Sequence, residues 1–227
     1  MTEAEKVGVA DAAHGRGSGQ KVWNIPNQLT VARLVLSVVF FVLLSLETHG
    51  EIHDTLVPGK IRILLNASLL VFVLAVITDF LDGYLARKWG LVSTFGRIAD
   101  PFADKIVICG GFIMLTGIAP RVIEPWYAVV IVFREFLVSG LRSFLESRGV
   151  AFGAAASGKL KMVLQSITIP VVIFYQANIA GDPVTAWDSI GYWAVFGFLL
   201  ATLLMTVGSC VSYLQRAIAL IRAQDAS

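Results

Sequence analysis

Charge and cysteine are both scarce in this chain. Only 15% of the 227 residues are charged, the formal net charge is +2, and there are two cysteines, Cys109 and Cys210. So small a net charge gives no support for nucleic-acid binding. Two cysteines are too few for a disulfide framework or a Cys-rich metal site, so we expect free buried thiols. With 56% hydrophobic residues and a mean hydropathy of +0.76, the composition excludes an ordinary soluble domain and predicts a membrane protein.

The longest polar segment is at the start of the chain. Residues 1–20 are small and polar and cannot bury a core, so we expect a disordered cytosolic tail, followed by a single membrane domain over residues 21–227. Residues 21–28, KVWNIPNQ, combine a Trp, a Pro and a Lys, as a short interfacial segment would. No small-residue cleavage site follows the first apolar run, which favours a retained helix over a signal peptide.

Six apolar runs follow, each close to the roughly 20 residues that a helix needs to cross a bilayer. They cover residues 29–46, 61–84, 99–118, 126–144, 160–179 and 190–214. This pattern predicts an all-α integral membrane protein with six transmembrane helices and both termini on one side. The segments on the other side hold only Lys60, Arg62 and Arg121 as basic residues, so the positive-inside rule places both termini in the cytosol. The predicted location is the cytoplasmic (inner) membrane.

Two patterns with the spacing of ligand sites are weak. His49 and His53 are four residues apart, as in a helical metal pair, but Gly50 lies between them and Pro58 follows, which argues against a helix. Residues 153–159, GAAASGK, have the spacing of a phosphate-binding loop, but Leu160 stands where a Ser or Thr would bind Mg²⁺. We expect neither a histidine metal site nor an ATP site.

Four carboxylates lie in or beside apolar runs, where an isolated charge is costly. Asp79 and Asp82 are three residues apart, and Asp100 and Asp104 are four apart, so on helices each pair shares one face. We expect the two pairs to face each other across a helical hairpin closed by the loop 88–97, at its cytosolic end. Carboxylates with no His or Cys nearby favour Mg²⁺ or Mn²⁺ over Zn²⁺, and a bound cation would keep them ionised.

Glycines and a basic residue accompany the carboxylates. Gly83 and Gly96 remove side chains where a phosphate ligand or a neighbouring helix could come close. Arg87 lies within reach of a phosphate or of the carboxylates. The alternative for each residue alone is ordinary: a solvated helix end, a positive-inside anchor or a packing glycine. For the whole constellation, the spacing favours a functional site.

The stretch from Asp79 to Asp104 reads D-x-x-D-G-x-x-A-R, eight residues, then G-x-x-x-D-x-x-x-D, with Ala86 beside Arg87. It resembles the signature of the CDP-alcohol phosphotransferases at all eight fixed positions. The resemblance implies a six-helix membrane enzyme, usually a homodimer, that uses two divalent metal ions. It also implies the reaction: an alcohol hydroxyl attacks the lipid-bearing phosphorus of a CDP-linked donor, and CMP leaves.

The resemblance also implies residue roles. Asp79, Asp82 and Asp100 would be metal ligands, and Asp104 would be the general base as well as lying near the second metal. A base within hydrogen-bond reach of the attacking hydroxyl and paired metals that neutralise charge are what such a displacement requires. The residues implied for CDP binding are Asn27, Thr30, Arg33, Asp82, Gly83, Ala86, Arg87 and Gly96.

Other segments bear on the acceptor alcohol. Residues 24–33, Arg134-Glu135-Phe136, Arg142 and residues 158–161 followed by Gln165 resemble phosphatidylglycerophosphate synthases, although Met162 stands where those synthases tend to carry Thr. The resemblance implies CDP-diacylglycerol as donor and glycerol 3-phosphate as acceptor.

Arg134, Arg142 and Lys159 are the candidates to bind the acceptor's phosphate, since guanidinium groups suit phosphate and Lys159 would lie at a helix start. The alternatives are positive-inside anchoring for Arg142 and Lys159, and an ion pair with Glu135 or a neighbouring helix for Arg134, which lies well inside an apolar run.

Two other functions remain open from the sequence. The same reaction type could use another acceptor, such as inositol phosphate, serine or a phospholipid. The four aspartates could also form the permeation site of a divalent cation transporter or channel. Transporters favour carboxylates near the bilayer midplane and broken helices in paired halves, whereas these carboxylates fall at the end of one hairpin.

Overall fold

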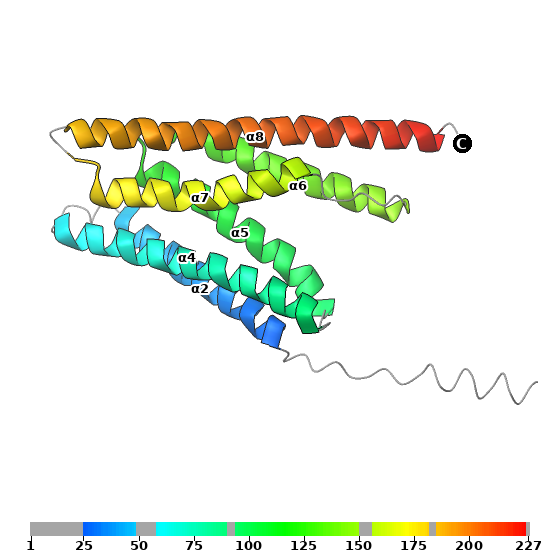
Figure 1. The fold of residues 1–227 in the computed structure, drawn as a ribbon, viewed down its shortest axis with the longest axis horizontal. Coiled ribbons are helices and arrows are strands. Elements are labelled where there is room, and N and C mark those ends of the chain that lie inside the picture. Colours follow the sequence, from blue (N-terminus) through cyan, green and yellow to red (C-terminus); the bar gives the residue numbers. More distant parts are fainter. Residues whose placement is uncertain (1–24, 49–57, 90–93, 150–155, 182–184, 226–227) are drawn as a thin grey trace, which may run out of the picture.

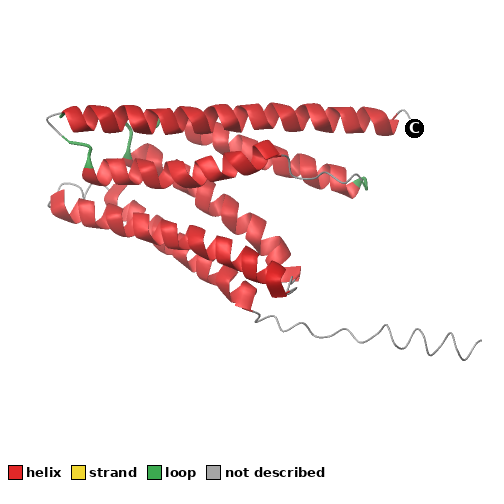
Figure 2. Cartoon of the chain, viewed as in Figure 1, coloured by secondary structure: helices red, strands yellow, loops and turns green. Residues whose placement is uncertain are grey.

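The computed structural model describes residues 25–48, 58–89, 94–149, 156–181 and 185–225, and the described part is all helical (Figures 1 and 2). Its helices are α2 (Ile25–Thr48), α4 (Pro58–Trp89), α5 (Thr94–Ile118), α6 (Pro125–Ser147), α7 (Ala156–Asn178) and α8 (Ala186–Asp225). Each corresponds to one of the six apolar runs, of which only the run 160–179 extends past its helix, by one residue. The predictions for the tail, for His49 and His53, and for residues 21–24 and 153–155 lie outside the described residues.

Local signals explain several helix ends. Pro125 opens α6, where its missing N–H costs nothing. Gly149 ends the same helix with φ +75°, a left-handed conformation that glycine adopts without strain. At the start of α8, the Thr185 hydroxyl accepts a hydrogen bond of 3.2 Å from the backbone N–H of Asp188, as an N-cap does.

The helices form one bundle in which α5 and α7 are central. Helix α5 packs against α2, α6 and α7, and α7 packs against α4, α5 and α8. Helix α2 also packs against α4, and α6 against α8. The start of α2 and the ends of α4, α6 and α8 lie toward one end of the bundle (Figure 1). A main core of residues such as Phe40, Phe72 and Phe112 fills the bundle, and a smaller cluster of Val138, Leu145, Tyr213 and Ala217 joins α6 to α8.

Large apolar side chains cover the outside of the bundle. Val35, Ile63, Phe80, Phe133 and Leu204 are all more than a third exposed, which is the pattern of a lipid-facing surface. Four helices are long and apolar enough to cross a membrane: the spans are Gln28–Glu47, Gly59–Leu81, Gly158–Asn178 and Ala186–Arg222. The chain is therefore an integral membrane protein. The prediction of six spans is confirmed for these four helices, and for α5 and α6 it stays a prediction.

Two sequence expectations need correction. The loop predicted over residues 88–97 is shorter, because α4 continues to Trp89 and α5 already begins at Thr94. The last helix is longer than the apolar run 190–214, since α8 extends from Ala186 to Asp225. The prediction of free buried thiols is confirmed for Cys109, whereas Cys210 is free but only half-buried.

Candidate active site

The acidic half of the site is assembled by α2. Thr30, Arg33 and Ser37 form a buried polar stripe on the face of α2 that also carries Phe40 and Leu44 in the core. Arg33 is 1% exposed, and its Nη1 lies 2.7 Å from Oδ1 of Asp104 on α5 and forms a second ion pair with Oδ1 of Asp79 on α4. Two of the four predicted carboxylates therefore converge, and they do so around an arginine.

This arrangement differs from the hairpin expected from the sequence. The two aspartate pairs were predicted to face each other directly across α4 and α5. Among the described residues, α2 packs against both of these helices and supplies the positive charge that joins Asp79 to Asp104. Arg33 precedes Asp104 by 71 residues, so local periodicity could not reveal the contact.

The remaining motif residues are placed by their backbone only. Asp82, Gly83, Ala86 and Arg87 follow Asp79 on the same helix, and Gly96 and Asp100 precede Asp104 on α5, so the helical spacing assumed for both aspartate pairs is confirmed. Asn27 lies in the first turn of α2. The side chains of these seven residues lie outside the part of the chain that the structure describes.

Two cavities meet at Asp104. A small one of about 60 Å³ borders Arg33, Asp79 and Asp104, together with Met162 and Ser166 of α7. A larger one of about 340 Å³ lies between α5, α6, α7 and α8. Asp104, Ile108 and Met162 line both cavities, so the carboxylate of Asp104 stands at the boundary between them.

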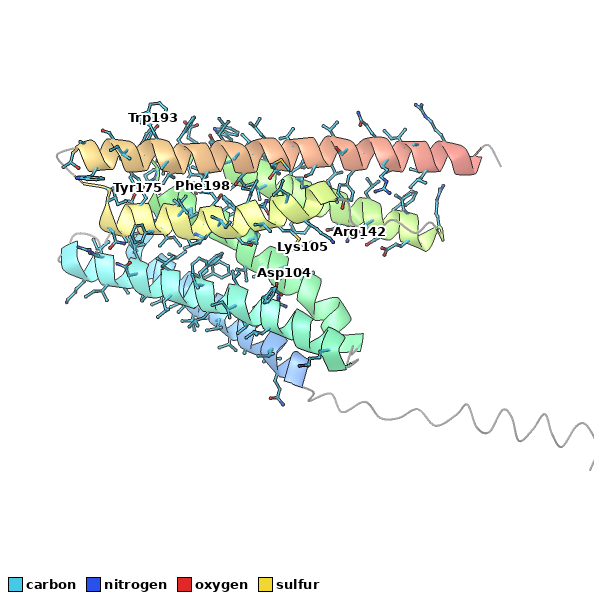
Figure 3. The ribbon with its side chains drawn as sticks, in the orientation of Figure 1. Asp104, Lys105, Arg142, Tyr175, Trp193 and Phe198 are labelled. Atoms are coloured by element: carbon cyan, nitrogen blue, oxygen red, sulfur yellow. The ribbon has the colours of Figure 1, made fainter. Side chains whose placement is uncertain are left out.

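The larger cavity has a basic wall. Figure 3 shows Asp104, Lys105 and Arg142 in the half of the bundle toward the C-terminus, far from Tyr175. Basic and acidic side chains line the cavity as follows: Lys105, Arg134, Arg142, Lys159 and Lys161 against Asp104 and Glu135. The five basic and two acidic groups leave an excess of three positive charges, so the cavity suits an anion.

Arg134 occupies the interior of this wall. It is 7% exposed, and its Nη2 donates a hydrogen bond of 3.0 Å to the hydroxyl of Ser209, while its guanidinium lies 5.7 Å from the ring centre of Tyr213. Its Nη1 is 3.4 Å from Oε1 of Glu135. The ion pair considered from the sequence therefore exists, and it lies in the cavity wall. The guanidinium is held on three sides.

Glu135 joins two cations. The same Oε1 atom forms an ion pair with Nζ of Lys161, which is 1% exposed. A buried carboxylate shared by two basic groups stabilises both charges away from water. The Arg134–Glu135–Lys161 triad thus links α6 to α7 at the cavity.

All three predicted acceptor residues are brought together. Arg134 and Arg142 come from α6, eight residues apart on one face, and Lys159 comes from the first turn of α7. Arg142 has a buried Nε without a hydrogen-bond partner among the described residues. The prediction that Lys159 lies at a helix start is confirmed, and the role of the three residues stays a prediction.

Sequence reasoning assigned no role to several residues of the cavity. They are Lys105, Lys161, Gln165 and Tyr213. Lys161 and Gln165 carried a usable signal, because polar residues four apart inside an apolar run share one helix face. Tyr213 carried none, since one aromatic residue in a long apolar helix is ordinary.

The fold and the site define a helical membrane protein with a polar, basic cavity open beside paired carboxylates. The family model for CDP-alcohol phosphatidyltransferase matches residues 23–207, which include both halves of the site. The chain belongs to this family, as the resemblance of its motif predicted. It is a transferase of phospholipid biosynthesis, and the family is generally metal-dependent.

Characterised relatives are similar over most of their length. A CDP-diacylglycerol–glycerol-3-phosphate 3-phosphatidyltransferase of Mycoplasma pneumoniae is 35% identical over 200 residues, covering 85% of this chain and 86% of the relative. Proteins of the same name from Bacillus subtilis and Rickettsia felis are 33% and 36% identical. The former alignment covers 68% of this chain and 78% of the relative, and the latter 66% and 75%.

Proposed function

We propose that this protein transfers the phosphatidyl group of CDP-diacylglycerol to glycerol 3-phosphate, giving phosphatidylglycerophosphate and CMP. The observation that carries the proposal is the 340 Å³ cavity, whose basic wall lies against the Asp104 carboxylate. A cavity of this size fits a small molecule, and its excess of positive charge matches a phosphate monoester. The names of the aligned relatives support the same donor and acceptor.

The acceptor's phosphate binds to Arg134, Arg142 and Lys159. Arg142 has its buried Nε free to donate, and Arg134 is already oriented by Ser209 and Tyr213, so little ordering is needed when the ligand arrives. Lys159, in the first turn of α7, adds a charge where the helix dipole also favours an anion.

The metal site consists of Asp79, Asp82, Asp100 and Asp104, which would hold two divalent cations, Mg²⁺ or Mn²⁺. The described residues fit such a group, because Asp79 and Asp104 come from different helices and an oxygen of each reaches the same atom of Arg33. Carboxylate oxygens gathered around one positive charge are a hard-ligand set that suits these ions. Cations held by these carboxylates would supply positive charge to neutralise the donor's diphosphate.

Asp104 acts as the general base. It lines both cavities, so its carboxylate lies between the acceptor cavity and the small cavity beside Asp79. It takes the proton of the attacking glycerol hydroxyl as the hydroxyl oxygen bonds to the lipid-bearing phosphorus. The bond from that phosphorus to the bridging oxygen breaks, and CMP carries away the electron pair.

The donor's cytidine diphosphate binds on the acidic side of the site. Asn27, Thr30 and Arg33 of α2, with Asp82, Gly83, Ala86, Arg87 and Gly96 of the motif, form this part. Thr30 and Arg33 are both 1% exposed on the inward face of α2, and Arg33 lines the small cavity. Arg33 would then exchange part of its contact with the two carboxylates for the donor's diphosphate.

In the membrane, we propose six spans, with α5 and α6 crossing the bilayer together with the other four helices, and the active site and both termini in the cytosol. The domain over residues 21–227 forms a homodimer, and residues 1–20 are a cytosolic tail. The charged cavity residues of α5 and α6 face the bundle interior, which is where ionisable groups within membrane helices belong. Family membership sets the cation-transporter alternative aside.

A panel of acceptors tests the function. Purified protein in detergent or lipid nanodiscs is given CDP-diacylglycerol and Mg²⁺ or Mn²⁺ with glycerol 3-phosphate, inositol phosphate, serine or a phospholipid. We expect CMP release with glycerol 3-phosphate and a product of the mass of phosphatidylglycerophosphate. If CMP is released only with a different acceptor, the proposed acceptor is wrong. If CMP is released with none of the acceptors, the proposed reaction is wrong.

A further inference from the structure

Gln165 places an amide in the wall of the larger cavity. It is 1% exposed, and its Nε2 is buried without a hydrogen-bond partner among the described residues. Leaving a buried amide donor without a partner costs roughly 1–3 kcal/mol. A polar group kept at that cost beside a ligand cavity indicates a partner that arrives with the ligand.

No described residue accepts a hydrogen bond from this Nε2 atom. Lys161, one turn earlier on the same face of α7, and Arg134 on α6 carry only hydrogen-bond donors. The Oε1 atom of Glu135 is shared between these two cations, and the hydroxyl of Ser139, which also lines the cavity, does not pair with the amide. An acceptor oxygen of a bound molecule can therefore supply the missing partner.

Gln165 shares the larger cavity with residues of both functional walls. It is one helical turn beyond both Lys161, which pairs with Glu135 of the basic wall, and Met162, which lines both cavities together with Asp104. A ligand that extends from the basic wall toward Asp104 occupies the cavity that this amide lines. The last side-chain torsion of glutamine is broad, so a small rotation can turn the amide into the cavity.

We propose that Gln165 is a specificity-determining residue that hydrogen-bonds the secondary hydroxyl of glycerol 3-phosphate. This inference rests on the proposed function. The acceptor has a phosphate at one end, the attacking hydroxyl at the other and a second hydroxyl between them. A glutamine amide can both donate and accept a hydrogen bond, and so can a hydroxyl group. A charged side chain at this position would instead interact with the phosphate or with the basic wall.

The test compares two acceptors that differ only at this hydroxyl. We expect the unmodified protein to use glycerol 3-phosphate with a kcat/KM about tenfold above that for 3-hydroxypropyl phosphate, which lacks it, as loss of one neutral hydrogen bond would give. In Gln165→Met, of nearly the same shape, the preference should fall to about onefold to twofold, with the value for 3-hydroxypropyl phosphate little changed. Gln165→Asn keeps a polar side chain but shortens its reach, and should lose the same preference if the Met variant folds poorly.

Thr206→Val is the matched control. Thr206 also has a buried hydroxyl without a partner among the described residues, but it does not line the cavity. Its variant should keep the full preference. A Gln165 variant that retains the tenfold preference, or that lowers both acceptors equally, would overturn the inference.

A binding measurement separates this inference from the proposed function. Calorimetric titration with each acceptor should show glycerol 3-phosphate binding about tenfold more tightly than 3-hydroxypropyl phosphate to the unmodified protein, and with equal affinity to Gln165→Met. If the unmodified protein neither binds nor uses glycerol 3-phosphate, the proposed function fails and this inference with it. If the unmodified protein binds and uses glycerol 3-phosphate, and the Gln165 variants keep the full preference for it over 3-hydroxypropyl phosphate, only the inference fails.

Discussion

At the scale of single residues, the site depends on charges held away from water by other charges. Arg33 joins Asp79 to Asp104, and Glu135 joins Lys161 to Arg134. In both groups one ion of one sign lies between two of the other, so removing the middle member would leave two like charges facing each other in a poorly solvated place. Conservative substitutions at the outer members are therefore the informative ones.

Asp104→Asn should abolish turnover while the protein still folds. The amide keeps the shape and can still contact Arg33, but it cannot take a proton from the attacking hydroxyl, so CMP release should fall at least about a hundredfold. Glu146→Gln, an exposed carboxylate outside both cavities, is the control and should retain full activity. Wild-type turnover in Asp104→Asn, measured by CMP release, would remove Asp104 as the base.

Arg134→Lys should affect the acceptor and spare the donor. Lysine keeps the positive charge beside Glu135 but loses the planar fork that reaches Ser209 and the phosphate together. We expect the KM for glycerol 3-phosphate to rise about tenfold, with the KM for CDP-diacylglycerol unchanged. Arg148→Lys, exposed at the end of the same helix, should leave both constants as they are. An unchanged acceptor KM in Arg134→Lys would return Arg134 to a structural role.

At the scale of helices, close approach decides how α5 fits the bundle. A Cβ atom added to Gly110 would come within 2.7 Å of Cε1 of Phe41 on α2, and one added to Gly111 would come within 2.9 Å of Cδ1 of Ile169 on α7. These two glycines let α5 lie against both α2 and α7, and the same helix carries Asp104. Packing at Gly110 and Gly111 therefore helps to position the proposed base.

Gly110→Ala should destabilise the protein by about 1–3 kcal/mol, because the rigid ring of Phe41 must move and α5 shifts away from α2. The measurement is the thermal unfolding midpoint in detergent. Gly197→Ala on α8 is the control, since nothing lies within 4 Å of an added Cβ there and alanine is the better helix former. Its midpoint should stay the same or rise. An equal drop in both variants would contradict the packing account.

The helices were largely predictable, and the contacts between them were not. Period and length of apolar runs specify where a membrane helix lies, so five of the six runs fall within observed helices and the run 160–179 ends one residue beyond α7. Arg33 and Asp104, which form an ion pair, are 71 positions apart in the sequence. Glu135 and Lys161 are 26 positions apart. Such pairs depend on which helices pack together, and local periodicity carries no information about that.

At the scale of the whole molecule, the two ends of the bundle differ in charge. Arg142, Arg148, Arg216 and Arg222 lie in the cytosolic halves of their helices on the proposed orientation. The described basic residues at the other end are Lys60, Arg62 and Arg121. At that other end, Trp126 and Trp193 are exposed, as in the aromatic belt of a membrane interface. Both features favour one orientation.

Reporter fusions test this orientation. A fluorescent protein fused after Ser227 should be bright and an alkaline phosphatase fused there inactive, because the proposed topology places the C-terminus in the cytosol. A phosphatase fused after Ala180, between α7 and α8, should be active outside it. The reverse pattern would place the basic cavity on the outer face and would contradict the proposed topology.

The length of α8 has a consequence for the energetics of substrate capture. Tyr213 is 27 residues beyond Ala186, which is about 40 Å along the helix, whereas the hydrocarbon layer is only about 30 Å thick. The part of α8 that closes the basic cavity therefore lies at the level of the lipid headgroups. A phosphate dianion can bind at this level without losing its hydration to the hydrocarbon layer. The diacyl chains of CDP-diacylglycerol, the proposed donor, can stay in the hydrocarbon layer throughout.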